Sequence, residues 1–546
     1  MISGKGYTYF FGRKTVYIPR VDKRNVKVES KAKVTSTAMA TTTATTMATA
    51  TIREGNEKPR IDDNIVNYFK KVRSDFPFFR QKDCPVYFDS AATSHKPGCV
   101  IKDTVEFYTK ENANIHRGIY KMSLEATNRY EHVRELVKQY INCDSPNEII
   151  FTNGTTHGIN IVCNILMQKI VKKKEDEIYL SYLEHNSNII PWQEEVKKKK
   201  KGKIKYMSLK HGGYIHVKKL MKGINCNTKV ISISHVSNVL GNIQNINFVI
   251  KKIKKLNPNI IVVIDAAQSF PHLKYDIKKM VKNGSDPDIL IASGHKFCGL
   301  LGSGFIYIKN TLTRSYKLKP LLFGSNIVTE VGKYKSSFVK PPHLFETGTQ
   351  NISAILSMGV ALQFMQKIST NHAYAYEMYL YDLLLYYLRY HLGESLVELP
   401  LCRESGGRHG SGGRHDSGGR HDGGGRHDGG GRHDGGGRYD SVGRHGSGGD
   451  DLRIYVHNSR RLHFRKVGIL PLWSNRFTSF DLVTFLDFKN VCIRSGQHCA
   501  SLLHTKFLKV ADTSRISILF YNTPEEVQYL AEQIATVSRM LSGMKK

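Results

Sequence analysis

The chain has 546 residues, of which 40% are hydrophobic, and its 81 Lys and Arg residues outnumber its 47 Asp and Glu residues, giving a formal net charge of +34 at pH 7. This length allows two or three domains, and no apolar run approaches the length needed to cross a bilayer. Lysines are scattered along the chain, as at 172–174 and 197–201, so we expect solvated faces rather than a primary nucleic-acid or membrane surface. The nine dispersed cysteines include no CxxC pair, which argues against a metal site or a disulfide framework and predicts a reducing compartment.

Residues 1–60 differ in composition from the rest of the chain. Lys and Arg are accompanied there by few acids, and a tract rich in Thr, Ala and Met runs to Thr51. A basic, hydroxyl-rich and acid-poor leader is typical of an organelle transit peptide. The alternative is a disordered tail that carries no targeting signal. The apolar patch Tyr7–Phe11 is too short for a secretory signal.

From Asp62 onward short apolar runs alternate with helical or loop stretches. An apolar helix is predicted over 159–167. The predicted strands are 85–89, 148–152, 178–180, 230–234, 260–265, 289–292 and 304–308. Strands that alternate with helices predict an α/β fold with a largely parallel sheet covered on both faces.

A low-complexity segment occupies 403–450. Arg recurs there every six residues from Arg408 to Arg444, and His follows each Arg except at Tyr439. Because Gly fills most of the gaps, the segment lacks apolar surface to bury, and we expect a flexible insertion without a catalytic role. His-rich repeats can bind metal and Arg/Gly repeats can contact RNA, and both remain alternatives. Alternation resumes at 452–456 and 480–485, so a compact C-terminal domain is expected to continue across the insertion.

Three strand ends carry polar groups suited to a flat, anionic ligand. Gly154-Thr155-Thr156 lies between a strand and a helix, where free N–H groups and hydroxyls favour an anion, although a plain N-cap is the alternative. Asp265 ends the strand 260–265 and could hold a pyridine nitrogen protonated, or simply cap a helix. His185 follows the strand 178–180 and could stack on a ring, although a lone His is usually structural.

Two further peptides carry candidate covalent chemistry. Lys296 follows the apolar run 288–292 and could form a Schiff base. Cys499 follows Gly, a polar residue and His on a predicted turn, and could act as a nucleophile. Either peptide alone is weak evidence, but together they indicate covalent sulfur chemistry at one site.

With these residues the ordered part of the chain resembles the SufS-type (group II) cysteine desulfurases, within the fold-type I family of pyridoxal-phosphate (PLP) enzymes. The resemblance runs from about residue 62 to 540, apart from the insertion. The matching peptides are 88–92 (FDSAA), 114–118 (NIHRG), 154–160 (GTTHGIN), 184–192 (EHNSNIIPW), 235–241 (HVSNVLG), 265–268 (DAAQ), 293–296 (SGHK), 346–349 (ETGT), 494–500 (RSGQHCA) and 515–523 (RISILFYNT).

The resemblance implies a division into domains. It places a large PLP-binding domain with a mainly parallel sheet over 61–360, the first residues of which could pack on the small domain. It places a smaller C-terminal α+β domain, carrying the insertion, over 361–546. The leader over 1–60 lies outside both domains.

The resemblance also implies how pyridoxal 5'-phosphate is bound. Lys296 would carry the cofactor and later move the substrate's Cα proton. Asp265 would pair with the pyridinium nitrogen, Gln268 would bond the ring hydroxyl, and His185 would stack on the ring. The phosphate would be held by Thr155, Thr156, Ser293 and His295, with Thr349 reaching in from a second subunit of a homodimer.

For the substrate L-cysteine, the resemblance implies that Arg515 and Asn238 bind the carboxylate. Arg494 would shape the pocket beside the thiol. Ala91 would also line the substrate site, and His116 would lie at its mouth near the dimer interface. A small length change between Cys499 and Arg515 departs from the family pattern and bears on Arg515.

The implied reaction leaves a persulfide on Cys499 and releases alanine. We hypothesise that His498 or His295 assists formation of the thiolate, which is the nucleophilic form. A short Cys-bearing loop implies a SufE-type sulfur acceptor, with SUF scaffold proteins for iron–sulfur cluster assembly. The leader and the Lys/Asn-rich body point to a plastid of the apicomplexan type.

Three alternatives stay open at the level of sequence. Selenocysteine lyase activity uses the same residues. A PLP aminotransferase would leave Cys499 without a role. A binding or scaffold protein would work through the basic repeats and not through Lys296.

Overall fold

The computed structural model describes residues 9–11, 14–16, 57–316, 318–399, 451–462 and 465–544. Residues 1–55 and 56–546 form separate units, and the first contains the antiparallel strands β1 (Tyr9–Phe11) and β2 (Lys14–Val16). Most of the predicted leader and the whole of the predicted insertion at 403–450 lie outside the described residues.

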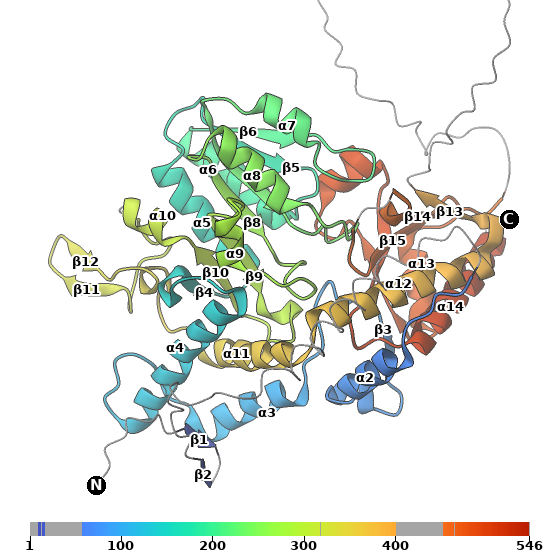
Figure 1. The fold of residues 1–546 in the computed structure, drawn as a ribbon, viewed down its shortest axis with the longest axis horizontal. Coiled ribbons are helices and arrows are strands. Elements are labelled where there is room, and N and C mark those ends of the chain that lie inside the picture. The colour runs from blue at the N-terminus through green and yellow to red at the C-terminus, as the bar shows by residue number, and fades with distance from the viewer. Residues whose placement is uncertain are drawn as a thin grey trace, which may run out of the picture. The chain divides into compact units, whose positions relative to one another are not determined.

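A seven-stranded sheet forms the centre of the N-terminal part of the second unit (Figure 1). In spatial order its strands are β4 (Ile149–Thr152), β10 (Gly304–Ile308), β9 (Ile289–Ser293), β8 (Ile261–Asp265), β7 (Thr228–Ser234), β5 (Glu177–Ser181) and β6 (Lys203–Met207). Only β10 runs antiparallel to its neighbours, so the predicted α/β fold with a mainly parallel sheet is confirmed. The predicted strands do not include β6, an edge strand in which two exposed lysines alternate with apolar residues that are partly or fully buried.

Helices cover both faces of this sheet because successive strand side chains point to opposite sides. In β8, Val262 and Ile264 belong to the apolar core shared with α4, α8, α9 and α11, whereas Ile261 and Val263 belong to the core shared with α5 and α6. The helices are α3 (Gly98–Glu106), α4 (Lys121–Ile141), α5 (Thr155–Lys169), α6 (Ile190–Lys199), α7 (Val217–Gly223), α8 (Ile246–Leu256), α9 (Ile277–Lys282), α10 (Asn310–Ser315) and α11 (Ile352–Lys367). An exposed hairpin of β11 (Val328–Val331) and β12 (Ser336–Phe338) precedes α11.

The C-terminal part has its own five-stranded sheet. Its spatial order is β13 (Leu396–Leu399), β14 (Ile454–His457), β15 (Ile469–Ser474), β18 (Thr513–Ser517) and β17 (Arg494–Gly496), and the long helices beside it are α12 (Thr370–Leu392) and α14 (Pro524–Met544). Leu396 of β13 pairs in parallel with Ile454 of β14, so the chain on the two sides of the predicted insertion is adjacent in one sheet. The remaining pairs in this sheet are antiparallel.

Residues 480–485, where structured sequence was expected to resume after the insertion, lie in helix α13 (Ser479–Asp487). Thr478 and Asp481 form a capping box, in which each side chain accepts a hydrogen bond from the other residue's backbone N–H. Leu482 and Leu486 are buried four residues apart, which is helical spacing.

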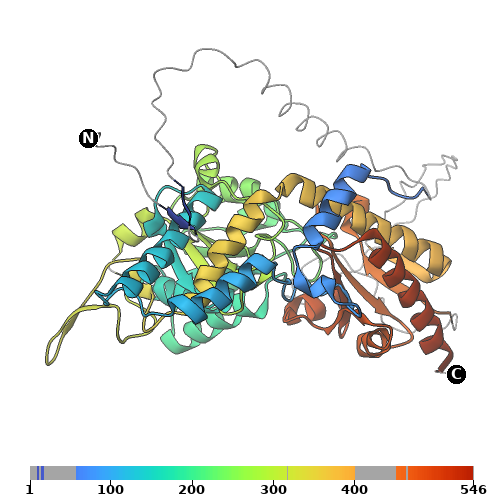
Figure 2. The same cartoon turned by 90° about the horizontal axis from the view of Figure 1, so that it is seen from below.

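The N-terminal helix α2 (Asp63–Arg73) packs against the C-terminal helices, as Figure 2 shows. The Phe69 ring stacks on Tyr376 of α12 with 4.6 Å between centroids, and Arg73 Nη2 lies 2.6 Å from Glu526 Oε1 of α14. Strand β3 (Val86–Tyr87) then pairs with β16 (Val491–Cys492). Within the described residues no single helix is long and apolar enough to cross a membrane; α11 and α12 pass that test only as a pair, bent by 81°.

Candidate active site

A pocket of about 270 Å³ lies at the carboxyl edge of the large sheet. Because β4, β5, β7, β8 and β9 run in the same direction, the loops that follow them meet at this edge. The C-terminal domain closes the pocket with residues from β17, β18 and the loop between them. The predicted site residues that line it are Ala91, Thr155, Thr156, His185, Asn238, Asp265, Gln268, Ser293, His295, Lys296, Arg494, Cys499 and Arg515.

One end of the pocket is built from the start of α5. Gly154 has a φ of +133°, a conformation that disfavours L side chains, and a Cβ there would lie 3.4 Å from Ser293 Oγ. The N–H of Thr155 donates to Ser293 Oγ at 2.8 Å, and the hydroxyls of Thr156 and Ser187 are 2.8 Å apart. Gly154 occupies the N-cap position of α5 without a side-chain capping bond, and both threonines lie inside the helix. The arrangement offers N–H and O–H donors to an anion.

A half-buried lysine and a buried carboxylate both line the pocket. Asp265 accepts a hydrogen bond from Ala267 N at 2.9 Å, and burial raises the pKa of its carboxyl group while Lys296 opposes that rise. Burial lowers the pKa of Lys296 to about 8, against the opposing effect of Asp265. The lysine is therefore partly neutral near physiological pH, as a nucleophilic or proton-transferring amine requires.

Two further side chains from the large domain are fixed by hydrogen bonds. His185 Nδ1 accepts from Ser187 N at 3.1 Å, and burial, reinforced by nearby cations, lowers the pKa of His185 to about 4. Gln268 Nε2 donates to the Ala91 carbonyl at 2.7 Å and retains a second N–H on the same nitrogen. The pocket therefore contains a neutral, flat imidazole and an oriented amide.

The opposite end of the pocket is cationic. Arg515 is buried, donates to Asn238 O at 3.1 Å, and lies 2.8 Å from a carboxylate oxygen of Asp89. Arg494 lies 4.0 Å from the other oxygen of the same carboxylate. Asp89 had no role predicted from the sequence, although it lies in the matching peptide 88–92. The available signal was an acidic residue at the end of the predicted strand 85–89.

The loop that carries the thiol is tied to the large domain on both sides. His498 and Cys499 have φ values of +51° and +54°, a left-handed conformation that is uncommon for these residue types and often found at functional sites. Asn186 N donates to the Cys499 carbonyl at 2.6 Å, and Asn238 Nδ2 donates to the His498 carbonyl at 2.7 Å. The Cys499 residue itself is exposed. These bonds hold an accessible thiol at the pocket.

The two imidazoles expected to assist this thiol are weak bases in the structure. Burial, followed by the effect of nearby cations, lowers the pKa of His498 to about 2 and that of His295 to about 4. His498 Nε2 also lies 3.0 Å from the Thr513 carbonyl. The assistance of His498 or His295 stays a prediction, and these pKa values weigh against it.

Two predicted residues do not line the pocket of a single protomer. Thr349 is exposed after the 3-10 turn His343–Phe345. His116 has a φ of +73° and packs against Tyr130 and His343, with ring centroids 5.8 and 5.5 Å away. Neither is among the described residues that line the pocket.

Comparison with known proteins places this geometry in a family. The aminotransferase class-V model matches residues 86–400 and 451–530, and so leaves out the segment between them. The putative cysteine desulfurase PbSufS of Plasmodium berghei (strain Anka) is 60% identical, covering 90% of this chain and 91% of that relative. The cysteine desulfurase SufS of Plasmodium vivax is 51% identical, covering 99% and 96%, and that of Plasmodium falciparum (isolate 3D7) is 57% identical, covering 90% of each.

Solved structures of cysteine desulfurases have a similar fold. The apo structure of cysteine desulfurase from Thermococcus onnurineus NA1 has a TM-score of 0.67 at 25% identity, covering 89% of this chain and 99% of that one. The cysteine desulfurase CsdA (S-sulfonic acid) from Escherichia coli has a TM-score of 0.67 at 24% identity, covering 86% and 98%, and supports the fold alone. The chain belongs to the aminotransferase class-V family of PLP-dependent enzymes and, within it, to the SufS cysteine desulfurases.

Proposed function

We propose that this protein is a PLP-dependent cysteine desulfurase that converts L-cysteine to L-alanine through a persulfide on Cys499. One observation carries the proposal: a pocket of about 270 Å³ brings together a half-buried lysine, a buried carboxylate and an accessible thiol. A lysine and a carboxylate are what PLP chemistry needs, and a nucleophilic thiol is what sulfur removal adds.

The residues of the pocket fit PLP. The start of α5 and Ser293 would hold the phosphate, where His295 Nδ1 is a buried nitrogen without a hydrogen-bond partner among the described residues. Asp265 would face the pyridine nitrogen, Gln268 the ring hydroxyl, and His185 the ring face. When bound, the cofactor supplies an electron sink for negative charge that develops on the substrate's carbon skeleton.

The protein's own groups position the substrate. Arg515 presents a planar pair of donors that matches a carboxylate, and Asp89 and the Asn238 carbonyl fix its orientation. The neutral form of Lys296, with a pKa of about 8, would take the proton from the substrate's α-carbon. Arg494 would add positive charge beside the thiol.

The sulfur step is then the transfer of one sulfur atom from the substrate to Cys499. The thiolate of Cys499 attacks the substrate sulfur and forms an S–S bond, while the Cβ–S bond breaks with its electron pair left on the carbon skeleton. That skeleton takes up a proton and leaves as alanine, and the persulfide remains on Cys499. Because backbone hydrogen bonds tie the loop at residues 498 and 499, the sulfur has little freedom to travel. We therefore propose a separate SufE-type acceptor that passes sulfur to SUF scaffold proteins for iron–sulfur cluster assembly.

A homodimer would complete the site. Thr349 and His116 lie outside the pocket of one protomer, which fits the proposal that each acts at the partner's pocket. Two inactive variants test it: Lys296→Ala and Thr349→Ala subunits, mixed after co-expression, are expected to regain part of the activity. No gain over either parent would contradict a shared site.

We also propose that the protein acts in an apicoplast. The basic, Thr-rich residues 1–60 and the Plasmodium origin of the close relatives support this location. A fusion of residues 1–60 to a fluorescent protein is expected to accumulate in that organelle, and a cytosolic signal would contradict the proposal.

Mass spectrometry tests the central proposal. The PLP-loaded protein is exposed to L-cysteine without an acceptor, and Cys499 is expected to gain the mass of one sulfur atom while alanine forms in proportion. Undiminished alanine formation by Cys499→Ala would instead favour chemistry that does not use this thiol.

A further inference from the structure

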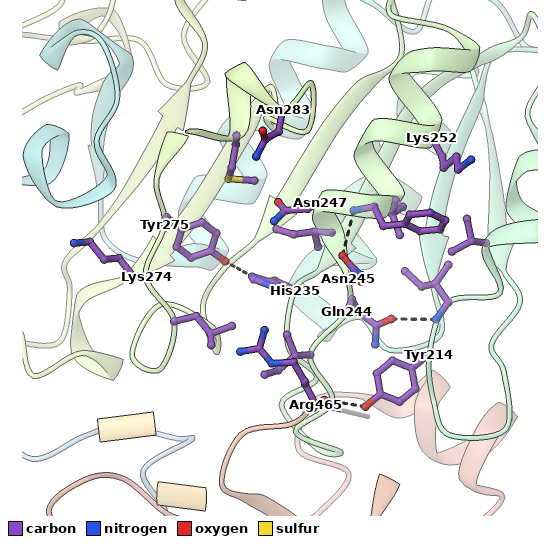
Figure 3. Close-up of a pocket in the computed structure, with 18 of the residues that line it drawn as sticks. Tyr214, His235, Gln244, Asn245, Asn247, Lys252, Lys274, Tyr275, Asn283 and Arg465 are labelled. Carbon is purple, nitrogen blue, oxygen red and sulfur yellow. Dashed lines mark hydrogen bonds between the residues drawn. The ribbon is translucent and has the colours of Figure 1, made fainter. Parts of the chain in front are cut away.

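A second and larger hollow lies behind the wall of the active site. Its volume is about 1580 Å³, and it is lined by α7, α8, α9, the loops between them and the start of α12. In Figure 3, Lys274 and Lys252 lie on opposite sides, His235 lies between them, and Arg465 approaches from the C-terminal domain. We call this hollow the basic groove, after the cations that line it: Lys210, Lys218, Lys222, Lys252, Lys274, Lys279 and Arg465.

Cations outnumber carboxylates more strongly in the groove than in the chain as a whole. Seven cations line it with a single carboxylate, Asp276, whereas the whole chain has 81 Lys and Arg to 47 Asp and Glu. All seven cations are exposed, and among the described residues none of them lies within 4.0 Å of a carboxylate oxygen. The groove therefore holds uncompensated positive charge that favours an anionic partner.

The groove also offers apolar and amide contacts. Phe248 is 48% exposed, and Lys252 Nζ lies 5.5 Å from its ring centroid. Asn245, Asn247 and Asn283, labelled in Figure 3, also line the groove. An occupant that combines acidic with apolar side chains would use all three kinds of contact.

Size and charge narrow the choice of occupant. Pockets for small molecules measure about 300–1,000 Å³, so a groove of about 1580 Å³ is better matched to an extended polypeptide. The protein's own segments outside the described residues are poor candidates, because residues 1–56 carry ten Lys and Arg to three Asp and Glu, and residues 401–450 carry eight Arg to seven Asp and Glu. A second copy of this chain, with a net charge of +34, is disfavoured for the same reason.

We propose that the basic groove is a docking site for an extended acidic segment of a partner protein. Successive residues at the end of β7 divide between the two hollows: Ser234 and Val236 line the active-site pocket, and His235 between them lines the groove. His235 Nδ1 is hydrogen-bonded to the hydroxyl of Tyr275, which also lines the groove. A docked partner would thus be held next to the active site without occupying it. This proposal stands independently of the reaction assigned to that site.

Fluorescence anisotropy tests the proposal on the full-length, PLP-loaded protein. The probe is a fluorescein-labelled peptide of alternating Glu and Leu residues. The double variant Lys218→Glu/Lys252→Glu is expected to weaken its binding by about tenfold or more, since each lost ion pair is worth up to about 1 kcal/mol and reversal adds repulsion. The matched control is Lys173→Glu/Lys174→Glu, which makes the same charge change on exposed residues outside the groove and is expected to alter Kd less than twofold.

Several outcomes would overturn the proposal. Equal weakening by both double variants would mean that overall charge, not the groove, binds the peptide. Tighter, groove-dependent binding of an oligouridine RNA than of the peptide would assign the groove to nucleic acid. Should the reversal variant fail to fold, Lys218→Ala/Lys252→Ala replaces it, with an expected weakening of about threefold. Because none of these lysines lines the active-site pocket, persulfide formation is expected to be unchanged. A protein that binds the peptide through the groove but forms no persulfide would reject the proposed function alone.

Discussion

The active-site pocket and the basic groove are both lined by residues at the end of β7, but their charged groups differ in burial and in pairing. In the pocket, buried Arg515 lies 2.8 Å from an Asp89 carboxylate oxygen, Lys296 shares the pocket with Asp265, and hydrogen bonds fix the surrounding groups. In the groove, exposed lysines face solvent with almost no carboxylate among them. Charged groups that stabilise a reaction must be oriented and excluded from water. Charged groups that attract a binding partner act best at a solvated surface. Four perturbations separate the two regions.

Replacement of Cys499 is expected to have the largest effect. Cys499→Ala should lower alanine formation from L-cysteine by about 1,000-fold or more, because the nucleophile that accepts sulfur is removed. Binding of the Glu/Leu peptide should be unchanged, since Cys499 does not line the groove. Steady-state alanine assays and anisotropy measure the two effects, and a parallel loss of both would show that the regions are not separable.

Arg515→Lys is the next strongest change. It keeps the charge but loses the planar pair of donors, and losing one charge-assisted hydrogen bond should reduce kcat/KM by about 10- to 100-fold. The loss is expected mainly in KM for cysteine. Arg494→Lys is the control, because its side chain is 50% exposed and a smaller effect is expected there. An equal effect of both substitutions would contradict the special role of Arg515.

The pH dependence of cofactor loading tests Lys296. With a pKa of about 8, this amine is mostly protonated at pH 6.5 and becomes neutral as the pH rises through 8. The rate at which apoenzyme takes up PLP should therefore rise by about tenfold between these pH values and then level off. Visible absorbance follows the uptake. A rise that continues towards pH 10 would mean that the amine keeps its ordinary pKa.

A change in salt concentration is expected to give the smallest difference between the properties of the groove and those of the active-site pocket. Raising ionic strength from about 0.05 to 0.3 M shortens the screening length, so Kd for the Glu/Leu peptide should increase by about fivefold. The kcat/KM for cysteine should change less than twofold, because its charges act inside a largely buried pocket. Equal salt sensitivity in the two assays would contradict the contrast between buried and solvated charge.

Sequence patterns predicted most of the large sheet because its central strands are buried on both faces. Runs such as 260–264 and 289–292 are apolar throughout, which suits strands between two helical layers. The same criterion does not find β6, an edge strand in which exposed lysines alternate with apolar residues, and it does not identify 480–485 as the helix that the capping box and the spacing of Leu482 and Leu486 favour. Short alternating stretches do not distinguish these cases by themselves.

By itself the sequence determined the chemistry available to this protein: a lysine, a strand-end carboxylate and a thiol within ten matching peptides. Only the tertiary structure decided which groups share a pocket. It placed Asp89 against Arg515, left Thr349 and His116 outside the pocket of one protomer, and gathered cations from several segments into the basic groove. The physical reason is that these contacts depend on the order of strands in the sheet and on how the C-terminal domain closes over its edge. Neither is encoded in a local pattern.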